Sequence, residues 1–252
     1  MSVANGFRLR ALVRSVPGAG KSHFAATCPK SYFIISPPGE EDTWMVRPQL
    51  KSNVVKAVIL APTSDADTKR TFAELDAAIA EANGWAKEGK VETLIIDNMT
   101  NLTEMRWIYI NQFQKILNKQ GEVDTRSMYG SLNRWCRGFV NMSLLSFPGH
   151  LVVTCHEQME EEEKMDRLPD KSSPIVPAIL GGFRDDIGSY FSMDLSLEKK
   201  VLGATHQFIA RTNKGNQRNS KSRYPLPPII ENISYQSLVS AVQQSLGTGT
   251  PA

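Results

Sequence analysis

The chain has 252 residues and a mass of 28.0 kDa, with 41% hydrophobic and 22% charged residues. This composition is that of a globular protein, and it excludes a disordered chain, a collagen-like repeat and a small disulfide-held scaffold. The three cysteines lack CxxC spacing, which predicts free thiols in a reducing compartment. No apolar stretch approaches the roughly 18 residues of a membrane span, and residues 1–10 lack a signal-peptide core, so we expect a cytoplasmic protein without a membrane partner.

Charge is distributed unevenly along the chain. The formal net charge is +3, from 29 basic and 26 acidic residues. Residues 199–230 contain seven basic residues and no acid, so the rest of the chain has 22 basic against 26 acidic residues, a net charge of −4. This basic segment on a mildly acidic body favours a local phosphate-binding site, although a solvated basic hairpin would have the same composition.

Apolar runs alternate with helical periodicity, which predicts an α/β fold with a mostly parallel central sheet flanked by helices. In chain order, strands are predicted at 9–13, 32–35, 54–60, 93–96 and 151–154. Helices are predicted at 21–27, 71–87, about 102–116, about 132–145 and 233–246.

The last third of the chain has a different character. Residues 190–197 and 207–211 are expected to pair as a C-terminal β-hairpin extension near Lys199 and Lys200. We expect a single domain over residues 1–235, followed by a helix end and flexible tail at 236–252. Within that domain we expect a mobile loop at about 157–177 and a basic hairpin region at about 199–224.

The strongest functional signal lies between the first strand and the first helix, where residues 15–22 read SVPGAGKS; we refer to them as the phosphate loop. A turn of small residues lets backbone N–H groups converge on a phosphate chain, and the following helix adds its positive N-terminal end. Lys21 is expected to reach the β- and γ-phosphates, and the Ser22 hydroxyl to bind Mg²⁺. The predicted nucleotide-binding residues are Ser15, Pro17, Gly18, Ala19, Gly20, Lys21, Ser22 and His23.

Ser15 stands where this phosphate-binding pattern asks for glycine. Serine is tolerable at that position unless the backbone there needs a positive φ. The alternative for the whole segment is a chance turn of glycine and serine. Its place between a strand and a helix favours the phosphate site.

A second element of the site is the apolar strand at 94–97, which reads LIID. Asp97 at its end can hold Mg²⁺ beside Ser22, although a strand can also end in Asp to cap a helix. The next residue is Asn98, so the second acid of an Asp-Glu pair is missing. The catalytic acid must therefore come from elsewhere in the chain.

Glu40 and Glu41 follow the second strand, at the sheet edge where open α/β folds bind ligands. We expect one of them, with Glu40 as our assignment, to polarise the attacking water; both could instead be solvated loop acids. Thr154 and His156 end the strand that follows Asp97 in the chain, and we expect them to sense the γ-phosphate. Polar residues at a strand end can also be ordinary loop residues.

In this order, the motifs resemble a known family, the phage-encoded RecA-like P-loop ATPases, which are phage nucleotide-binding proteins and include ATP-dependent single-strand annealing recombinases. The resemblance covers roughly residues 8–230. It is carried by the phosphate loop followed by FAATCP, by LIIDNMT at 94–100, by YG at 129–130 opening a long helix, by VVTCH at 152–156 and by KSRY at 221–224. The chain departs from the family pattern at Ser15 and by inserting SPPG before Glu40; the insertion bears on hydrolysis more than on nucleotide binding.

The resemblance implies a RecA-like core that assembles head to tail as a ring or filament, with ATP and Mg²⁺ between subunits and single-stranded DNA along the inner face. A single-strand-binding protein is a further candidate partner, and the compartment would be the host cytoplasm. Lys221 and Arg223 look like residues that reach a neighbour's γ-phosphate in trans, the alternative being contact with the DNA backbone. The expected DNA contacts are Lys119, Arg126, Lys164, Arg167 and Lys171.

The resulting expectation is an ATP-dependent, single-stranded-DNA-binding ATPase of phage recombination or replication. Two other classes stay open. A nucleotide-gated loader or scaffold with little hydrolysis would agree with the missing acid after Asp97. A P-loop kinase acting on a small molecule would need an arginine-bearing lid, which residues 211–223 could form.

Overall fold

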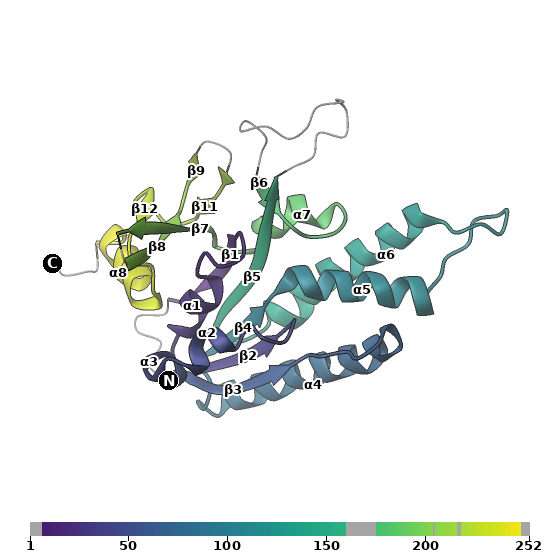
Figure 1. Cartoon of the computed structure of the whole chain (residues 1–252), viewed down its shortest axis with the longest axis horizontal. Coiled ribbons are helices and arrows are strands. Elements are labelled where there is room, and N and C mark those ends of the chain that lie inside the picture. Colours follow the sequence, from purple (N-terminus) through teal and green to yellow (C-terminus); the bar gives the residue numbers. More distant parts are fainter. Residues whose placement is uncertain (1–6, 160–174, 204, 216–217, 248–252) are drawn as a thin grey trace.

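A computed structural model describes residues 7–159, 175–203, 205–215 and 218–247, and Figure 1 shows how its layers are arranged. The central sheet has the strand order β12-β8-β7-β1-β5-β4-β2-β3, and the strands from β7 to β3 run parallel. These parallel strands are β1 (Arg10–Ser15), β2 (Ser31–Ile35), β3 (Val54–Ile59), β4 (Thr93–Asp97), β5 (His150–Met159) and β7 (Met193–Leu202). The predicted α/β fold with a mostly parallel sheet is confirmed.

Helices cover both faces of the sheet. One face packs against α4 (Thr68–Lys87), α5 (Met99–Phe113), α6 (Thr125–Gly138) and the π-helical η3 (Phe139–Leu144). The other packs against α1 (Lys21–Ala26), α2 (Asp42–Met45), α3 (Pro48–Lys51) and α8 (Tyr235–Ser245). Because side chains alternate along a strand, β1 sends Leu12 into the first core and Val13 into the second.

Side-chain caps set the starts of the long helices. The Asn98 side chain accepts a hydrogen bond from Asn101 N at 3.0 Å, so α5 begins at Met99. Asp124 accepts one from Ser127 N at 3.0 Å, so α6 begins at Thr125. Both helices therefore start earlier than the predicted positions of about 102 and about 132, because the capping hydrogen bond sets the helix start and the apolar series begins further along the helix.

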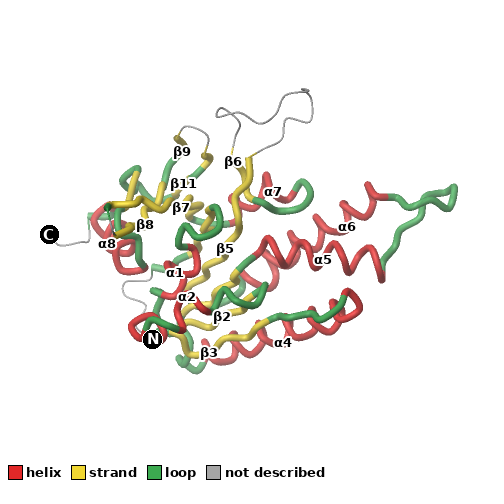
Figure 2. Tube along the Cα trace, in the orientation of Figure 1, coloured by secondary structure: helices red, strands yellow, loops and turns green. Residues whose placement is uncertain are grey.

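The helices α5 and α6 extend beyond the sheet as an arm, joined by the connection 114–124 at its tip (Figures 1 and 2). The aromatic rings of Trp107 and Tyr129 stack across the arm with centroids 4.3 Å apart. This stacking holds the pair of helices together where they leave the core.

The second half of the chain differs from expectation at two places. β5 continues to Met159 and pairs antiparallel with β6 (Ile175–Pro177), so both ends of the expected loop 157–177 are strands and only its interior lies outside the described residues. The predicted strand at 190–197 is displaced, because the 3₁₀ turn η4 (Ile187–Tyr190) delays β7 until Met193. The predicted pairing with the next strand is present, as β7 forms a hairpin with β8 (Thr205–Arg211).

Shorter elements complete the fold. They are η2 (Asp65–Asp67), α7 (Phe183–Asp186), β9 (Lys214–Gly215), β10 (Arg218–Asn219), β11 (Lys221–Ser222) and β12 (Ile229–Ile230). β11 pairs with the start of β7, and β12 with the end of β8, so the basic segment forms the outer part of the sheet. Within the described residues, no helix combines the length and the apolar character needed to cross a membrane.

Candidate nucleotide-binding site

The carboxyl ends of neighbouring parallel strands bring the predicted site residues together. Ser15 at the end of β1 lies opposite His156 of β5, and Asp97 ends β4 on the other side of β5. A cleft of about 320 Å³ opens at this edge. Its lining includes the predicted residues Pro17, Gly18, Gly20, Lys21, Ser22, His23, Glu40 and His156.

The phosphate loop connects β1 to α1 through two glycines with left-handed backbone. Gly18 has φ 76° and Gly20 has φ 99°, conformations that residues with a Cβ adopt at a cost. Ser15 belongs to β1 and is extended, so the missing first glycine is not required by the backbone. Ala19 is buried, and its N–H bonds to Val16 O at 3.4 Å, which closes the turn.

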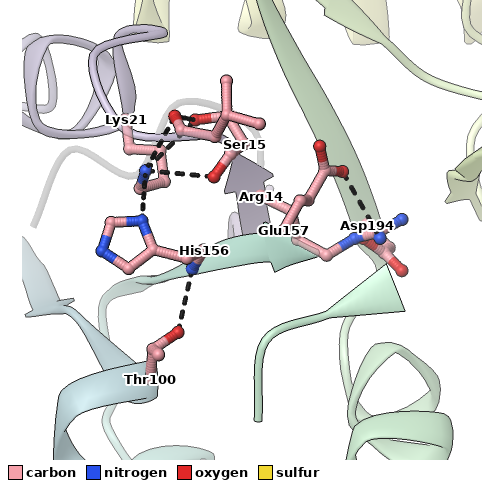
Figure 3. A network of polar contacts seen from close by, with 8 residues as sticks. Arg14, Ser15, Lys21, Thr100, His156, Glu157 and Asp194 are labelled. Carbon is pink, nitrogen blue, oxygen red and sulfur yellow. Dashed lines mark hydrogen bonds and ion pairs between the residues drawn. The ribbon is translucent and has the colours of Figure 1, made fainter. Parts of the chain in front are cut away.

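Lys21 is a buried cation whose close contacts within the described residues are neutral (Figure 3). Its Nζ lies 3.2 Å from both Ser15 O and Ser15 Oγ and 3.3 Å from Val16 O. It also lies 3.1 Å from His156 Nδ1, which accepts because the ammonium has only donors. Burial lowers the pKa of Lys21, while the charges on Asp97 and Glu40 oppose that shift.

Asp97 is 1% exposed and has one oxygen available for a further ligand. The Thr154 hydroxyl donates to Asp97 Oδ1 at 2.5 Å. Asp97 Oδ2 is buried without a hydrogen-bond partner among the described residues. Burial raises the pKa of this carboxyl to about 6, against the effects of the Thr154 and Ser22 hydroxyls and the charge on Lys21. A hard oxygen donor beside a hydroxyl fits the ligand chemistry of Mg²⁺.

The structure distinguishes the two candidate acids after β2. The Ser22 hydroxyl, on a side chain 5% exposed, donates to Glu40 Oε2 at 3.0 Å. Glu41 instead accepts from Gly39 N at 2.8 Å within its own turn. Glu40 therefore faces the phosphate loop, and Glu41 belongs to the loop that carries it.

Thr154 and His156 occupy different places in the network. Thr154 is fully buried behind Asp97, whereas His156 lies beside Lys21. The His156 N–H donates to Thr100 Oγ1 at 2.9 Å, which ties β5 to the first turn of α5. Burial, and then the charge on Lys21, lower the pKa of His156, so its ring is neutral and can accept from the ammonium.

Arg14, in β1, is a second buried cation near the phosphate loop. Arg14, next to Ser15 and 1% exposed, donates from Nε to Asp194 Oδ1 at 2.5 Å (Figure 3). Its Nη1 lies 3.5 Å from Glu157 Oε1. Burial acts to lower the pKa of Arg14, but the charges of Asp194 and Glu157 outweigh it, and the net shift is upward.

The basic residues predicted to act in trans lie away from the phosphate loop of their own chain. Lys221 lies opposite Asp194 in the β11–β7 pairing and lines a separate cleft of about 300 Å³ that also contains Arg14. Arg223 is exposed, and its Nη2 lies 3.4 Å from Ser189 O. Neither residue lines the cleft above the phosphate loop.

The predicted DNA contacts are only partly described. Lys119 and Arg126 are exposed at the tip of the α5–α6 arm. Lys164, Arg167 and Lys171 lie outside the described residues. The two groups of candidates therefore belong to different parts of the chain.

Several cleft residues carried no usable sequence signal. Besides the predicted set, the lining contains Thr43, Arg47, Lys199, His206 and Phe208. The last three come from the β7–β8 hairpin, which long-range pairing with β1 brings over the phosphate loop. Lys199 lies in the basic segment, so its charge was the one sequence feature that could have indicated it as a cleft residue. Phe208 lies in a strand of alternating pattern, which gives no reason to choose it over its neighbours.

The chain resembles one protein family over most of its length. A family model described as an AAA domain matches residues 8–224. A solved structure, that of a prototypical ATPase from the type III secretion system of pathogenic bacteria, is similar with 16% identity and a TM-score of 0.46. The similar region covers 75% of this chain and 52% of that one, so the chain spans about half the length of that ATPase. Among curated proteins, none matches. The chain belongs to the AAA domain family.

Proposed function

We propose that this protein is an ATPase that uses ATP with Mg²⁺, binds single-stranded DNA and acts in the recombination or replication of a bacteriophage. The observation that carries the nucleotide part is the convergence of Lys21, Ser22 and Asp97 at one edge of the sheet, with Glu40 bonded to the Ser22 hydroxyl. A cation, a hydroxyl and the Glu40 carboxylate line one cleft, and the buried Asp97 carboxylate lies close to Lys21 and Ser22; together they supply the groups that phosphoryl transfer requires.

Ser22 and the free oxygen of Asp97 would hold the metal, which when bound offsets phosphate charge and polarises the γ-phosphoryl group. Lys21 can exchange its neutral partners for phosphate oxygens, because no carboxylate in the described part of the chain holds it. Glu40 can accept a hydrogen bond from water and orient it. His156 keeps the ammonium in place from the β5 side.

The DNA part of the proposal is supported by charge and position. Lys119 and Arg126 are exposed on the projecting arm, where a polynucleotide backbone could reach them. The acid-free segment 199–230 forms the outer part of the sheet. Since Lys221 and Arg223 do not line the cleft of their own chain, a role at a neighbouring subunit's phosphates fits their position.

A nucleotide-gated loader is the second candidate, and one observation favours it. Asn98 uses its side-chain oxygen to cap α5, so no carboxylate follows Asp97. Orientation of the attacking water then depends on Glu40 alone among the residues we assign. If Glu40 does not orient water, the site binds ATP tightly and hydrolyses it slowly.

The decisive experiment measures the ATPase rate with and without single-stranded DNA, while light scattering records particle size with and without ATP. We expect DNA to raise turnover severalfold and ATP to enlarge the particle. Paired Lys119→Ala and Arg126→Ala substitutions should remove the DNA stimulation, whereas Lys90→Ala, on an exposed side chain beside Glu88, should not. Arg223→Ala should spare ATP binding and lower DNA-stimulated turnover.

Other outcomes select other functions. Turnover indifferent to DNA in every variant rejects the DNA proposal. Tight ATP binding with negligible hydrolysis in all conditions selects the loader. Turnover that requires a small-molecule acceptor selects a kinase.

A further inference from the structure

The cleft above the phosphate loop extends beyond the groups that we assign to phosphate and metal binding. An adjoining cleft of about 260 Å³ continues from it toward the start of α8. The residues that line both clefts are His23, Arg47, His206 and Phe208. One groove therefore runs from the phosphate-binding groups to a set of rings.

Phe208 lies directly on the phosphate loop. A Cβ at Gly20 would be 2.6 Å from Phe208 Cδ1, so the ring packs against the Gly20 backbone. The ring centroid of Phe208 lies 5.1 Å from that of His23 and 5.3 Å from that of His206, which is two residues earlier in β8. Three rings thus gather next to the residue that precedes Lys21.

The ring cluster carries one cation. Arg47 Nη1 lies 2.6 Å from His23 Nδ1, which must therefore accept the hydrogen bond. The far end of the groove consequently offers apolar ring faces with a guanidinium beside them, a surface suited to a flat aromatic ligand.

The geometry points to a nucleobase-binding wall in which Phe208 stacks on the base of the nucleotide whose triphosphate the phosphate loop holds, while His206, whose ring is inclined 66° to that of Phe208, contacts the edge of the base. This inference rests on the proposed function. It adds the residues that bind the base of the nucleotide, whereas the phosphate loop binds the triphosphate. Because every base has a π-face, stacking recognises nucleotides as a class and adds affinity more than choice among bases. A phosphate chain without a base gains nothing from the wall.

Calorimetric titration with Mg²⁺-ATP and with Mg²⁺-tripolyphosphate tests the wall. Phe208→Leu keeps an apolar contact on Gly20 and removes the aromatic face. We expect it to weaken ATP binding about 5-fold to 100-fold and to leave tripolyphosphate binding within about 2-fold of wild type. His206→Ala, on an exposed side chain, should weaken ATP binding less and in the same selective way. Phe113→Leu, on a ring 46% exposed at the end of α5, is the matched control and should change neither ligand.

The remaining outcomes overturn the inference in distinguishable ways. Equal loss of both ligands in Phe208→Leu means that the ring only supports the loop. Unchanged ATP binding in that variant, or equal affinity of the wild type for both ligands, rejects the wall and leaves the phosphate site intact. If the wild type binds neither ligand, the proposed function itself fails.

Discussion

Two buried cations lie near the end of β1, Arg14 in the strand itself and Lys21 at the start of α1, and they have opposite environments. Lys21 contacts neutral carbonyl, hydroxyl and imidazole groups, whereas Arg14 is matched by the carboxylates of Asp194 and Glu157. The pKa of Lys21 is accordingly lowered, mainly by burial, and that of Arg14 is raised. A buried cation without a carboxylate partner is available to an incoming anion, and one already paired serves the fold.

The largest effect is expected from Arg14→Met, which removes the guanidinium beside the buried carboxylates of Asp194 and Glu157. We expect a loss of about 3–5 kcal/mol in the free energy of unfolding, measured by urea denaturation. Adding Asp194→Asn and Glu157→Gln should recover much of that loss. Arg137→Met, which removes an exposed pair with Asp186, should cost less than about 1 kcal/mol. If Arg14→Met costs no more than this control, the structural role of Arg14 is wrong.

Lys21→Met tests whether the buried lysine serves ATP hydrolysis and not the stability of the fold. Because the ammonium is buried against neutral partners, its loss should leave the free energy of unfolding unchanged or slightly higher. The ATPase rate should fall roughly 100-fold to 1,000-fold, the usual loss for one charge-stabilising donor. Thermal denaturation and a steady-state phosphate assay measure the two effects. Strong destabilisation with residual turnover would reverse the assignment of the two cations.

Asp97→Asn tests the buried carboxylate through the pH dependence of the free energy of unfolding. The folded pKa of Asp97, about 6, lies above its ordinary 3.8, so the stability linked to the protonated acid is full below pH 3.8 and lost as pH rises through 6. Asparagine does not ionise, so this loss does not occur in the variant. Without ligand, its free energy of unfolding should exceed that of wild type by on the order of 3 kcal/mol above pH 6 and should equal it at low pH. Urea denaturation across this range measures the gain. A pH-independent difference from wild type contradicts a buried, ionising carboxylate. The variant should also lose the metal-dependent part of ATP binding.

The sequence predicted the parts of the fold and site that depend on local pattern. The phosphate loop and the strand ending in Asp97 combine a short motif with apolar periodicity, and both lie at the predicted sheet edge. Helix starts were predicted late, because Asn98 and Asp124 act as caps through single hydrogen bonds that periodicity does not register.

What the sequence could not predict depends on pairing between distant segments. Phe208 reaches Gly20 only because β7 pairs with β1 and β8 pairs with β7. Arg14 could not be told from an exposed basic residue before the structure placed Asp194 and Glu157 around it. The choice of Glu40 over Glu41 likewise depends on which way one turn points.

A crystal structure with Mg²⁺ and a non-hydrolysable ATP analogue would show directly whether the phosphate loop holds a triphosphate. We predict that the β- and γ-phosphates accept hydrogen bonds from backbone N–H groups of residues 18–22 and from Lys21 Nζ. The metal should lie about 2.1 Å from Ser22 Oγ, and the Asp97 carboxylate should lie next to the metal. A triphosphate bound elsewhere, or an Asp97 carboxylate remote from the metal, would contradict the account.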